Sequence, residues 1–233
     1  MADVVHALAE AAALGPFFEI VTDPAEECDP TWRPLPEQDP ERLLGLVDSY
    51  AERLGTGERR VAASILFQGL ASRLWSPVVV AAALGVVPDL SSLHWRWAPG
   101  APIALWLAEP SAVEGSGAEA IRSAVVEGQL RPLRAAMQEV VRLADGLMWG
   151  NAASSLAGTL RAGTLRPELA ARVDSLVREL LALDLFIGSG SFDVRGAFVR
   201  RSCCLYYKVP PGGGMCGDCA LLPRPAATGE SKI

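Results

Sequence analysis

Histidine is almost absent from the sequence. The 233 residues include only two histidines, His6 and His94. Catalytic sets of the Ser/His/Asp or Cys/His kind use a histidine to activate the nucleophile, so two histidines leave little room for such a set. A site with two histidine ligands on iron would have to recruit His6 from near the N-terminus. We therefore expect no chemistry that depends on histidine.

Clustered positive charge and long apolar runs are missing too. The formal net charge is −6 and no basic stripe is present. Because phosphate neutralisation dominates nucleic-acid binding, no nucleic-acid partner is expected. The longest strongly apolar run, 78–87, has ten residues, whereas a membrane-spanning helix needs roughly twenty. The N-terminus lacks the cationic start of a secretion signal. These absences predict a cytoplasmic protein without a transmembrane segment, and they leave peripheral membrane contact open.

No nucleotide-binding loop is visible. A Gly-x-Gly-x-x-Gly fingerprint must follow a strand and open a helix. The glycine-rich stretch 188–196 has its glycines at other spacings, and no helical pattern follows it. This stretch is predicted to be a turn, so the chain is not expected to bind a nicotinamide or flavin cofactor.

Most of the chain has helical periodicity. Half of the residues are hydrophobic and 21% are charged, which is a globular composition. Asp39 as cap, Pro40 at the first position and Gly55 at the end delimit one helix. The other predicted helices are 58–75, a short buried helix opened by Ser76–Pro77, one opened by a capping box at Ser116–Glu119, one running from Pro132 through 149–160, and one from Pro167.

Two stretches depart from the helical pattern. Residues 93–98 and 103–109 alternate or are rich in tryptophan and aliphatic residues, which predicts a hairpin with its turn at 99–102. Beyond residue 185 the helical period is lost. The sequence therefore predicts a predominantly helical α+β fold with a helical body at 1–185, a small segment at 186–223 and a flexible tail at 224–233.

Four of the five cysteines lie within seventeen positions. Cys203 and Cys204 are adjacent, eleven residues follow, and Cys216 and Cys219 form a Cys-x-x-Cys pair. In a reducing compartment clustered cysteines are more often metal ligands or redox groups than disulfides. Cys28 lies far away in a Pro- and acid-rich loop and is interpreted as a spare thiol.

The spacing alone leaves several sites open. Four thiolates satisfy one zinc ion or the two irons of a [2Fe–2S] cluster, and the Cys216-x-x-Cys219 pair suits both. Adjacent cysteines on extended backbone point to opposite faces, so Cys203 and Cys204 need irregular backbone to share a centre. This pairing is uncommon in zinc modules. A vicinal disulfide is the third alternative.

The cysteine segment resembles a known family. The stretches "RRSCCLYYKVP" and "CGDCALLP", together with "WGN" at 149–151, are similar to the FhuF-like ferric-siderophore reductases, which end in Cys-Cys, about ten residues and Cys-x-x-Cys. The spacer here has eleven residues, and glycines 212–214 can absorb the additional one.

The resemblance implies an iron–sulfur enzyme of iron uptake. Cys203, Cys204, Cys216 and Cys219 would hold a [2Fe–2S] cluster, and no catalytic residue beyond the cluster is expected. The activity would be one-electron reduction of a ferric siderophore, of hydroxamate type, with release of Fe(II). Since the chain has no nucleotide motif, a ferredoxin, flavodoxin or similar protein would supply the electron. A zinc-stapled helical binding module and a [2Fe–2S] redox sensor are the alternatives.

Charged residues beside the cysteines are candidates for tuning the cluster. A cluster with four thiolates is an anion that becomes more negative on reduction. Arg200 and Arg201 would therefore favour the reduced form, and Asp218 would oppose it. The alternative is that the arginines are ordinary solvated charges on a strand.

Five further residues are candidates for substrate contact. Trp149 could pack against the siderophore and Asn151 could bond a hydroxamate oxygen, or both could serve the interior of the body. Tyr206, Tyr207 and Lys208 could gate access to the cluster, or the tyrosines could simply shield it.

Overall fold

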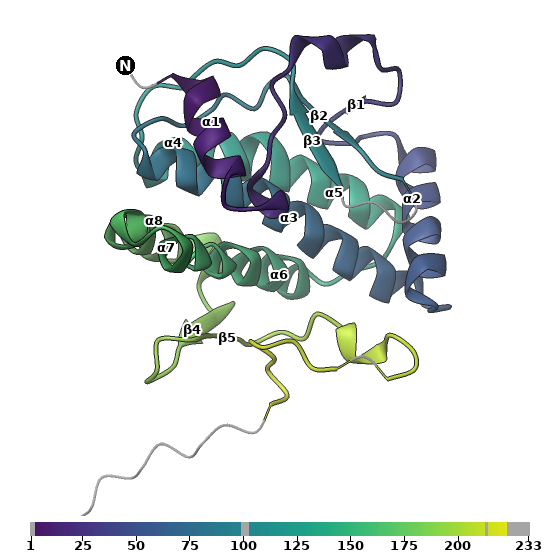
Figure 1. Ribbon diagram of the computed structural model, residues 1–233. Helices are drawn as coiled ribbons and strands as arrows, with labels where there is room; N and C mark the ends of the chain where they lie inside the picture. The colour runs from purple at the N-terminus through teal and green to yellow at the C-terminus, as the bar shows by residue number, and fades with distance from the viewer. Residues whose placement is uncertain (1–2, 99–102, 213, 223–233) are drawn as a thin grey trace, which may run out of the picture.

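One long helix, α3 (Arg59–Ala83), runs through the middle of the helical body. The computed structural model describes residues 3–98, 103–212 and 214–222. Helices α1, α2, α6 and α8 all pack against α3 (Figure 1). By length and composition alone α3 could cross a membrane, but 78% of its most apolar window is buried inside the protein. It is the core helix of this body.

The remaining helices and helical turns surround α3. The α-helices are α1 (Val4–Ala12), α2 (Pro40–Leu54), α4 (Ala118–Ile121), α5 (Arg131–Val140), α6 (Asp145–Gly158), α7 (Arg161–Leu165) and α8 (Ala170–Leu181). A π-helix, η3 (Arg122–Leu130), connects α4 to α5, and the short 3₁₀ turns are η1 (Pro16–Phe18), η2 (Pro24–Cys28), η4 (Pro167–Leu169), η5 (Asp184–Phe186) and η6 (Tyr206–Lys208).

Three predicted helix boundaries are confirmed. The carboxylate of Asp39 accepts hydrogen bonds from the backbone N–H groups of Glu41 and Arg42, and Gly55 ends α2 with φ of 63°. Pro167 starts the helical turn that leads directly into α8.

The predicted break at Ser76–Pro77 is wrong, because Pro77 lies inside α3. A proline in a helix lacks the N–H that would bond the carbonyl four residues earlier. The residues around it, Val78, Val79 and Val80, are completely buried. Packing on all sides of the helix therefore outweighs the lost hydrogen bond.

Two further helix predictions need correction. Ser116 does not cap a helix; the cap position is Gly117, and the carboxylate of Glu119 pairs with Arg122 at 2.6 Å instead of reaching back. The helix predicted from Pro132 through 160 is interrupted between α5 and α6, where Val141 has extended backbone. Val141 and Leu143 are both buried, so this connection is held by packing into the core.

The hairpin prediction is confirmed. Strands β2 (Leu93–Arg96) and β3 (Ala104–Leu107) pair antiparallel, and the predicted turn at 99–102 lies outside the described residues. Strand β1 (Arg33–Pro34) joins the other edge of β2. The sheet lies on the side of α3 away from the C-terminal segment (Figure 1).

A second antiparallel pair begins the C-terminal segment. Strand β4 (Gly190–Phe192) pairs with β5 (Phe198–Arg200), and the stretch 193–196 forms the turn between them. The predicted turn at 188–196 is thus part strand and part turn. Both strands pack on α6, whose other side packs on α3. The fold is predominantly helical α+β, as predicted; the boundary near 185 stays a prediction, and the tail at 224–233 lies outside the described residues.

Candidate metal centre

Helix α6 is the platform on which the cysteine segment rests, and Gly150 permits the close approach. A Cβ atom at Gly150 would collide with the hydroxyl of Ser202, the residue directly before Cys203. The glycine of the "WGN" stretch is therefore needed because another part of the chain occupies the place of its side chain.

Trp149 belongs to the interior of the body. Its ring makes an edge contact with Phe186 at a centroid distance of 5.9 Å, and the guanidinium groups of Arg131 and Arg134 lie 5.8 and 5.5 Å from its centroid. Only 9% of Trp149 is exposed. The structure gives this tryptophan a packing role and leaves little of its surface for a siderophore.

Asn151 connects three elements inside the protein. Its amide nitrogen donates to the carbonyl and the hydroxyl of Ser64 on α3, each at 2.9 Å, and its amide oxygen accepts from Arg200 at 2.8 Å. The Ser64 hydroxyl in turn donates to the backbone carbonyl of Cys204 at 2.8 Å. Because Asn151 is completely buried, it holds the cysteine segment against the body and has no surface that a siderophore could touch.

Arg200 links both halves of the cysteine motif. Its Nε donates to the Asp218 carboxylate at 3.0 Å, and its backbone N–H donates to the Asp218 carbonyl at 3.1 Å. The Arg200 side chain is fully buried. Arg201, by contrast, is exposed, and its backbone N–H donates to the carbonyl of Ser189 at 2.8 Å. The two candidate tuning arginines therefore lie in opposite environments.

The Asp218 carboxyl is held as an anion beside the cysteines. Burial acts to raise its pKa, but a hydrogen bond from Ser154 on α6, the charge and hydrogen bond of Arg200, and a hydrogen bond from Cys216 outweigh burial and lower the pKa on balance. The ion pair with Arg200 therefore holds the Cys-x-x-Cys loop against β5, and the hydrogen bond from Ser154 holds it against α6.

The four thiols come together at the end of β5. The Sγ atoms of Cys204 and Cys216 are 3.6 Å apart, and Cys203 is electrostatically coupled to both Cys204 and Cys219. All of them are free thiols, so the vicinal disulfide is not formed. Leu205, with φ of 69°, supplies the irregular backbone expected beside the adjacent cysteines.

The local backbone already offers hydrogen bonds to two of the sulfurs. The N–H of Leu205 donates to Sγ of Cys203 at 3.3 Å, and the N–H of Leu221 donates to Sγ of Cys219 at 3.4 Å. Burial raises the pKa of the Cys203 and Cys216 thiols, and the neighbouring thiols raise it further. A metal that binds the thiolates would remove this penalty on deprotonation.

The donor set suits a cluster with two irons. Such a cluster takes two thiolates on each iron, and the segment offers four cysteines within seventeen positions. Among the described residues, the buried Nη2 of Arg200 has no hydrogen-bond partner. Buried donors are normally satisfied, and the charge of Arg200 acts on Cys203 and Cys216, so an anionic cluster would be a suitable acceptor.

The other candidate residues lie at the edge of this centre. Tyr206 and Tyr207 on η6 are 40% and 41% exposed. The ammonium of Lys208 pairs with the carboxylate of Glu58, just before α3, at 2.9 Å. Cys28 is exposed on η2, away from the other cysteines in sequence. Tyr206 and Tyr207 could therefore meet a partner or substrate, whereas Lys208 already has an ionic partner.

Several residues of the centre carry no signal in the sequence. Ser64, Ser154 and Ser202 are ordinary serines in their local patterns, and only the packing of α3, α6 and β5 reveals their contacts. Gly150 and Asn151 were noticed as part of "WGN", but in a different role.

Comparison with known proteins agrees with the donor set. Residues 200–221 match the family described as FhuF 2Fe-2S C-terminal domain. No curated protein matches the chain. The matched range begins at the buried Arg200 and includes all four clustered cysteines. The match supports a [2Fe–2S] cluster as the cofactor. It also agrees with the resemblance of residues 200–221 to the FhuF-like ferric-siderophore reductases.

Proposed function

We propose that the protein reduces ferric siderophores, of hydroxamate type, by one electron and so releases Fe(II). The observation that carries this proposal is the set of four free thiols gathered within a matched FhuF-type [2Fe–2S] domain. When bound, such a cluster supplies single electrons, and conversion of Fe(III) to Fe(II) consumes one.

The chemical logic lies in the chelator. Hydroxamate oxygens hold hard Fe(III) far more tightly than Fe(II), so one added electron loosens the complex and frees the iron. For a one-electron couple every 59 mV, roughly, changes the equilibrium tenfold. Removal of Fe(II) can therefore draw an unfavourable transfer forward.

The chain's own charges set the environment of the electron. Arg200 is fully buried and its charge acts on Cys203 and Cys216. A buried cation favours the more negative, reduced form, and the paired Asp218 offsets part of this effect. Arg201 is exposed, so water and salt screen it. Tuning is accordingly assigned chiefly to Arg200 and Asp218.

A separate protein is proposed as the electron donor. The sequence has no dinucleotide fingerprint, and apolar side chains are exposed on both sides of the Cys-x-x-Cys loop in sequence: Met215 is 49% and Leu221 is 50% exposed. Tyr206 and Tyr207, also exposed and close to the cysteines in sequence, are further side chains on which a ferredoxin or flavodoxin would dock.

The test begins with protein purified without oxygen. We expect optical bands and a paramagnetic-resonance signal of a [2Fe–2S] cluster, and release of Fe(II) to a ferrous trap when the reduced protein meets a ferric hydroxamate. Cys216→Ala should lose both, whereas Cys28→Ala should keep both, since Cys28 lies outside the matched domain. A protein that carries the cluster but releases no Fe(II) would be a redox sensor instead.

A further inference from the structure

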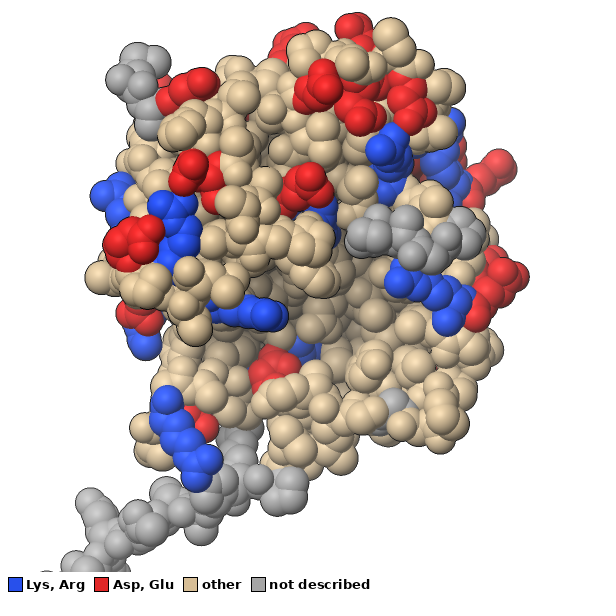
Figure 2. All heavy atoms as spheres, in the orientation of Figure 1, with Lys and Arg blue, Asp and Glu red and all other residues tan. Residues whose placement is uncertain are grey.

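A hollow opens between η1 and α6 on the face shown in Figure 2. Its volume is about 340 Å³, and Phe17, Phe18, Gln68, Ser154, Gly158 and Arg161 are among the residues that line it. We call it the η1–α6 groove. Small-molecule sites in proteins usually have volumes of roughly 300–1,000 Å³, so the groove is large enough to take part of a compact chelate.

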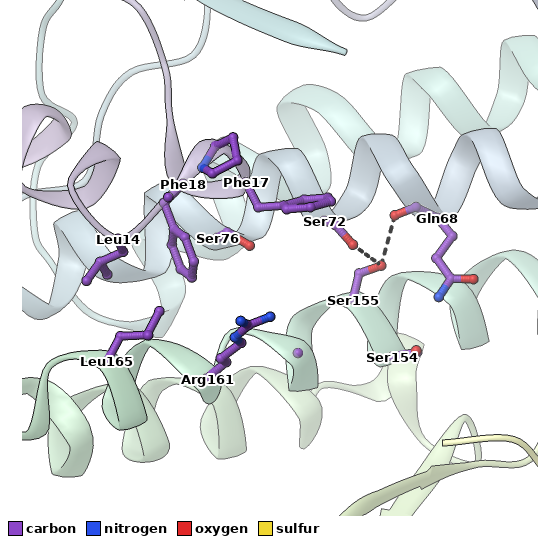
Figure 3. A pocket seen from close by; sticks show the side chains of 13 residues that line it. Leu14, Phe17, Phe18, Gln68, Ser72, Ser76, Ser154, Ser155, Arg161 and Leu165 are labelled. Carbon is purple, nitrogen blue, oxygen red and sulfur yellow. Dashed lines mark hydrogen bonds between the residues drawn. The ribbon is translucent and has the colours of Figure 1, made fainter. Parts of the chain in front are cut away.

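Arg161 projects into the η1–α6 groove from the side opposite to Phe17 (Figure 3). In the part of the chain that the structure describes, its guanidinium has neither an ion pair nor a hydrogen bond, although many other arginines are paired with carboxylates. Arg161 is an exposed residue, so water solvates its charge while the hollow is empty, and an oxygen-rich ligand that enters the hollow can pair with it.

The other walls suit an organic shell around such oxygens. Phe17 is 58% exposed, an unusual amount for a phenylalanine. Next to the Phe17 ring, Ser72 and Ser155 are hydrogen-bonded to each other at 3.0 Å and add hydroxyl groups to the lining (Figure 3). One apolar ring, one cation and several hydroxyls are thus presented to the same space.

The η1–α6 groove leads towards the cysteines. A second hollow of about 460 Å³ shares Ser154 and Gly158 with it and is lined on its far side by Gly217 and Asp218, the two residues inside the Cys-x-x-Cys loop. Ser154 also hydrogen-bonds the Asp218 carboxylate. A ligand that fills both hollows would reach from Arg161 to the loop that holds Cys216 and Cys219.

We propose that the η1–α6 groove and the adjoining hollow bind the ferric chelate, with Arg161 donating to iron-bound hydroxamate oxygens and Phe17 covering the organic shell. The inference rests on the proposed function and narrows its substrate class. A charge in contact acts more strongly than charges beyond the screening length of about 8–10 Å. Arg161 therefore favours a neutral tris-hydroxamate over one that carries a free ammonium group.

Binding can be measured without electron transfer by using gallium(III) tris-hydroxamates, because Ga(III) matches Fe(III) in its coordination but does not accept the electron. Titration calorimetry on the cluster-loaded full chain gives the dissociation constant. We expect Arg161→Gln to raise it about tenfold, the size of one charge-assisted hydrogen bond, and Phe17→Ala to raise it about fivefold. The preference for the neutral complex over the ammonium-bearing one should shrink in Arg161→Gln.

Arg142→Gln is the matched control, because Arg142 is exposed, carries the same charge and is not among the residues that line the two hollows. It should bind the gallium complex as the wild type does. Unchanged affinity in both Arg161→Gln and Phe17→Ala would overturn the proposal, as would an equal loss in Arg142→Gln.

These experiments distinguish failure of the binding-site proposal from failure of the proposed reductase function. Wild-type protein that reduces a ferric hydroxamate while the Arg161 and Phe17 variants bind and react normally would refute the groove and leave the reductase function intact. Binding of the gallium complex that depends on Arg161, with no reduction of the ferric one, would support the groove and refute the reductase function.

Discussion

At the scale of single residues, the "WGN" stretch explains how a helix can hold the iron–sulfur segment. Trp149 fills the interior next to Phe186, Gly150 makes room for Ser202, and Asn151 connects Ser64 to Arg200. Each of the three residues contacts a different part of the chain, and Gly150 does so because it has no side chain. The stretch is therefore a support for the metal centre.

Substitution of Gly150 tests this support. Gly150→Ala places a methyl group where the Ser202 hydroxyl lies, so we expect a loss of about 1–3 kcal/mol in the free energy of unfolding and a lower cluster content. Thermal unfolding and the iron content per chain are the measurements.

The control for that change lies on the same helix. A Cβ at Gly146 would meet nothing within 4 Å, so Gly146→Ala should leave the protein equally or more stable, by up to about 1 kcal/mol. The double change Gly150→Ala with Ser202→Gly should recover part of the loss. Equal behaviour of the two alanine variants would contradict the close-approach argument.

The two arginines before the cysteines allow a second test at the residue scale. Arg200→Gln removes a buried cation beside the sulfurs, so the midpoint potential of the cluster should become more negative, as followed by paramagnetic resonance in a redox titration. Arg201→Gln removes an exposed charge and should shift the potential much less. The same shift in both variants would exclude a special role for the buried position. Arg200→Lys keeps the charge and covers the case in which Arg200→Gln loses the cluster.

At the scale of elements, α6 makes packing contacts on two of its faces. One face packs on α3, and the other carries β4 and β5. The turn η6 returns to the beginning of α3, where Lys208 pairs with Glu58. The cysteine segment is thus held by α6 through buried contacts and by α3 through both a buried hydrogen bond and a surface ion pair.

The ion pair should be the weaker of these attachments. Lys208 and Glu58 have side chains that are 37% and 54% exposed, and exposed ion pairs contribute little to stability because solvent and salt screen them. We expect Lys208→Ala to leave the free energy of unfolding almost unchanged and to retain the cluster, as judged by denaturant titration and absorbance. Ser64→Ala, which removes the buried bond to Cys204, should cost more, about 1–3 kcal/mol. The reverse order would mean that η6 is the main anchor.

At the scale of the whole molecule, net charge bears on the proposed function because it acts on a substrate before contact. The chain carries a formal charge of −6, so we expect it to repel a trianionic ferric tris-catecholate but not a neutral ferric hydroxamate. At low salt, we expect the ferric hydroxamate to be reduced much faster than the ferric tris-catecholate. Raising the ionic strength should narrow the difference in rate, since the repulsion is screened. Initial rates with both complexes at several salt concentrations are the measurement, and a faster catecholate would contradict the argument.

The sequence by itself determined where the metal centre lies. The cysteine spacing marked the ligand segment, because ligands from one short segment must be close in space, and the resemblance of that segment to the FhuF-like family pointed to a [2Fe–2S] cluster among the alternatives that the spacing left open. Caps such as Asp39 and Gly55 were also readable, since they act within a few residues. Only the tertiary structure decided that Asn151 is buried, that Pro77 lies within a helix and that Arg161 lines a hollow next to α6. These facts depend on which distant segments pack together, and local patterns do not record that.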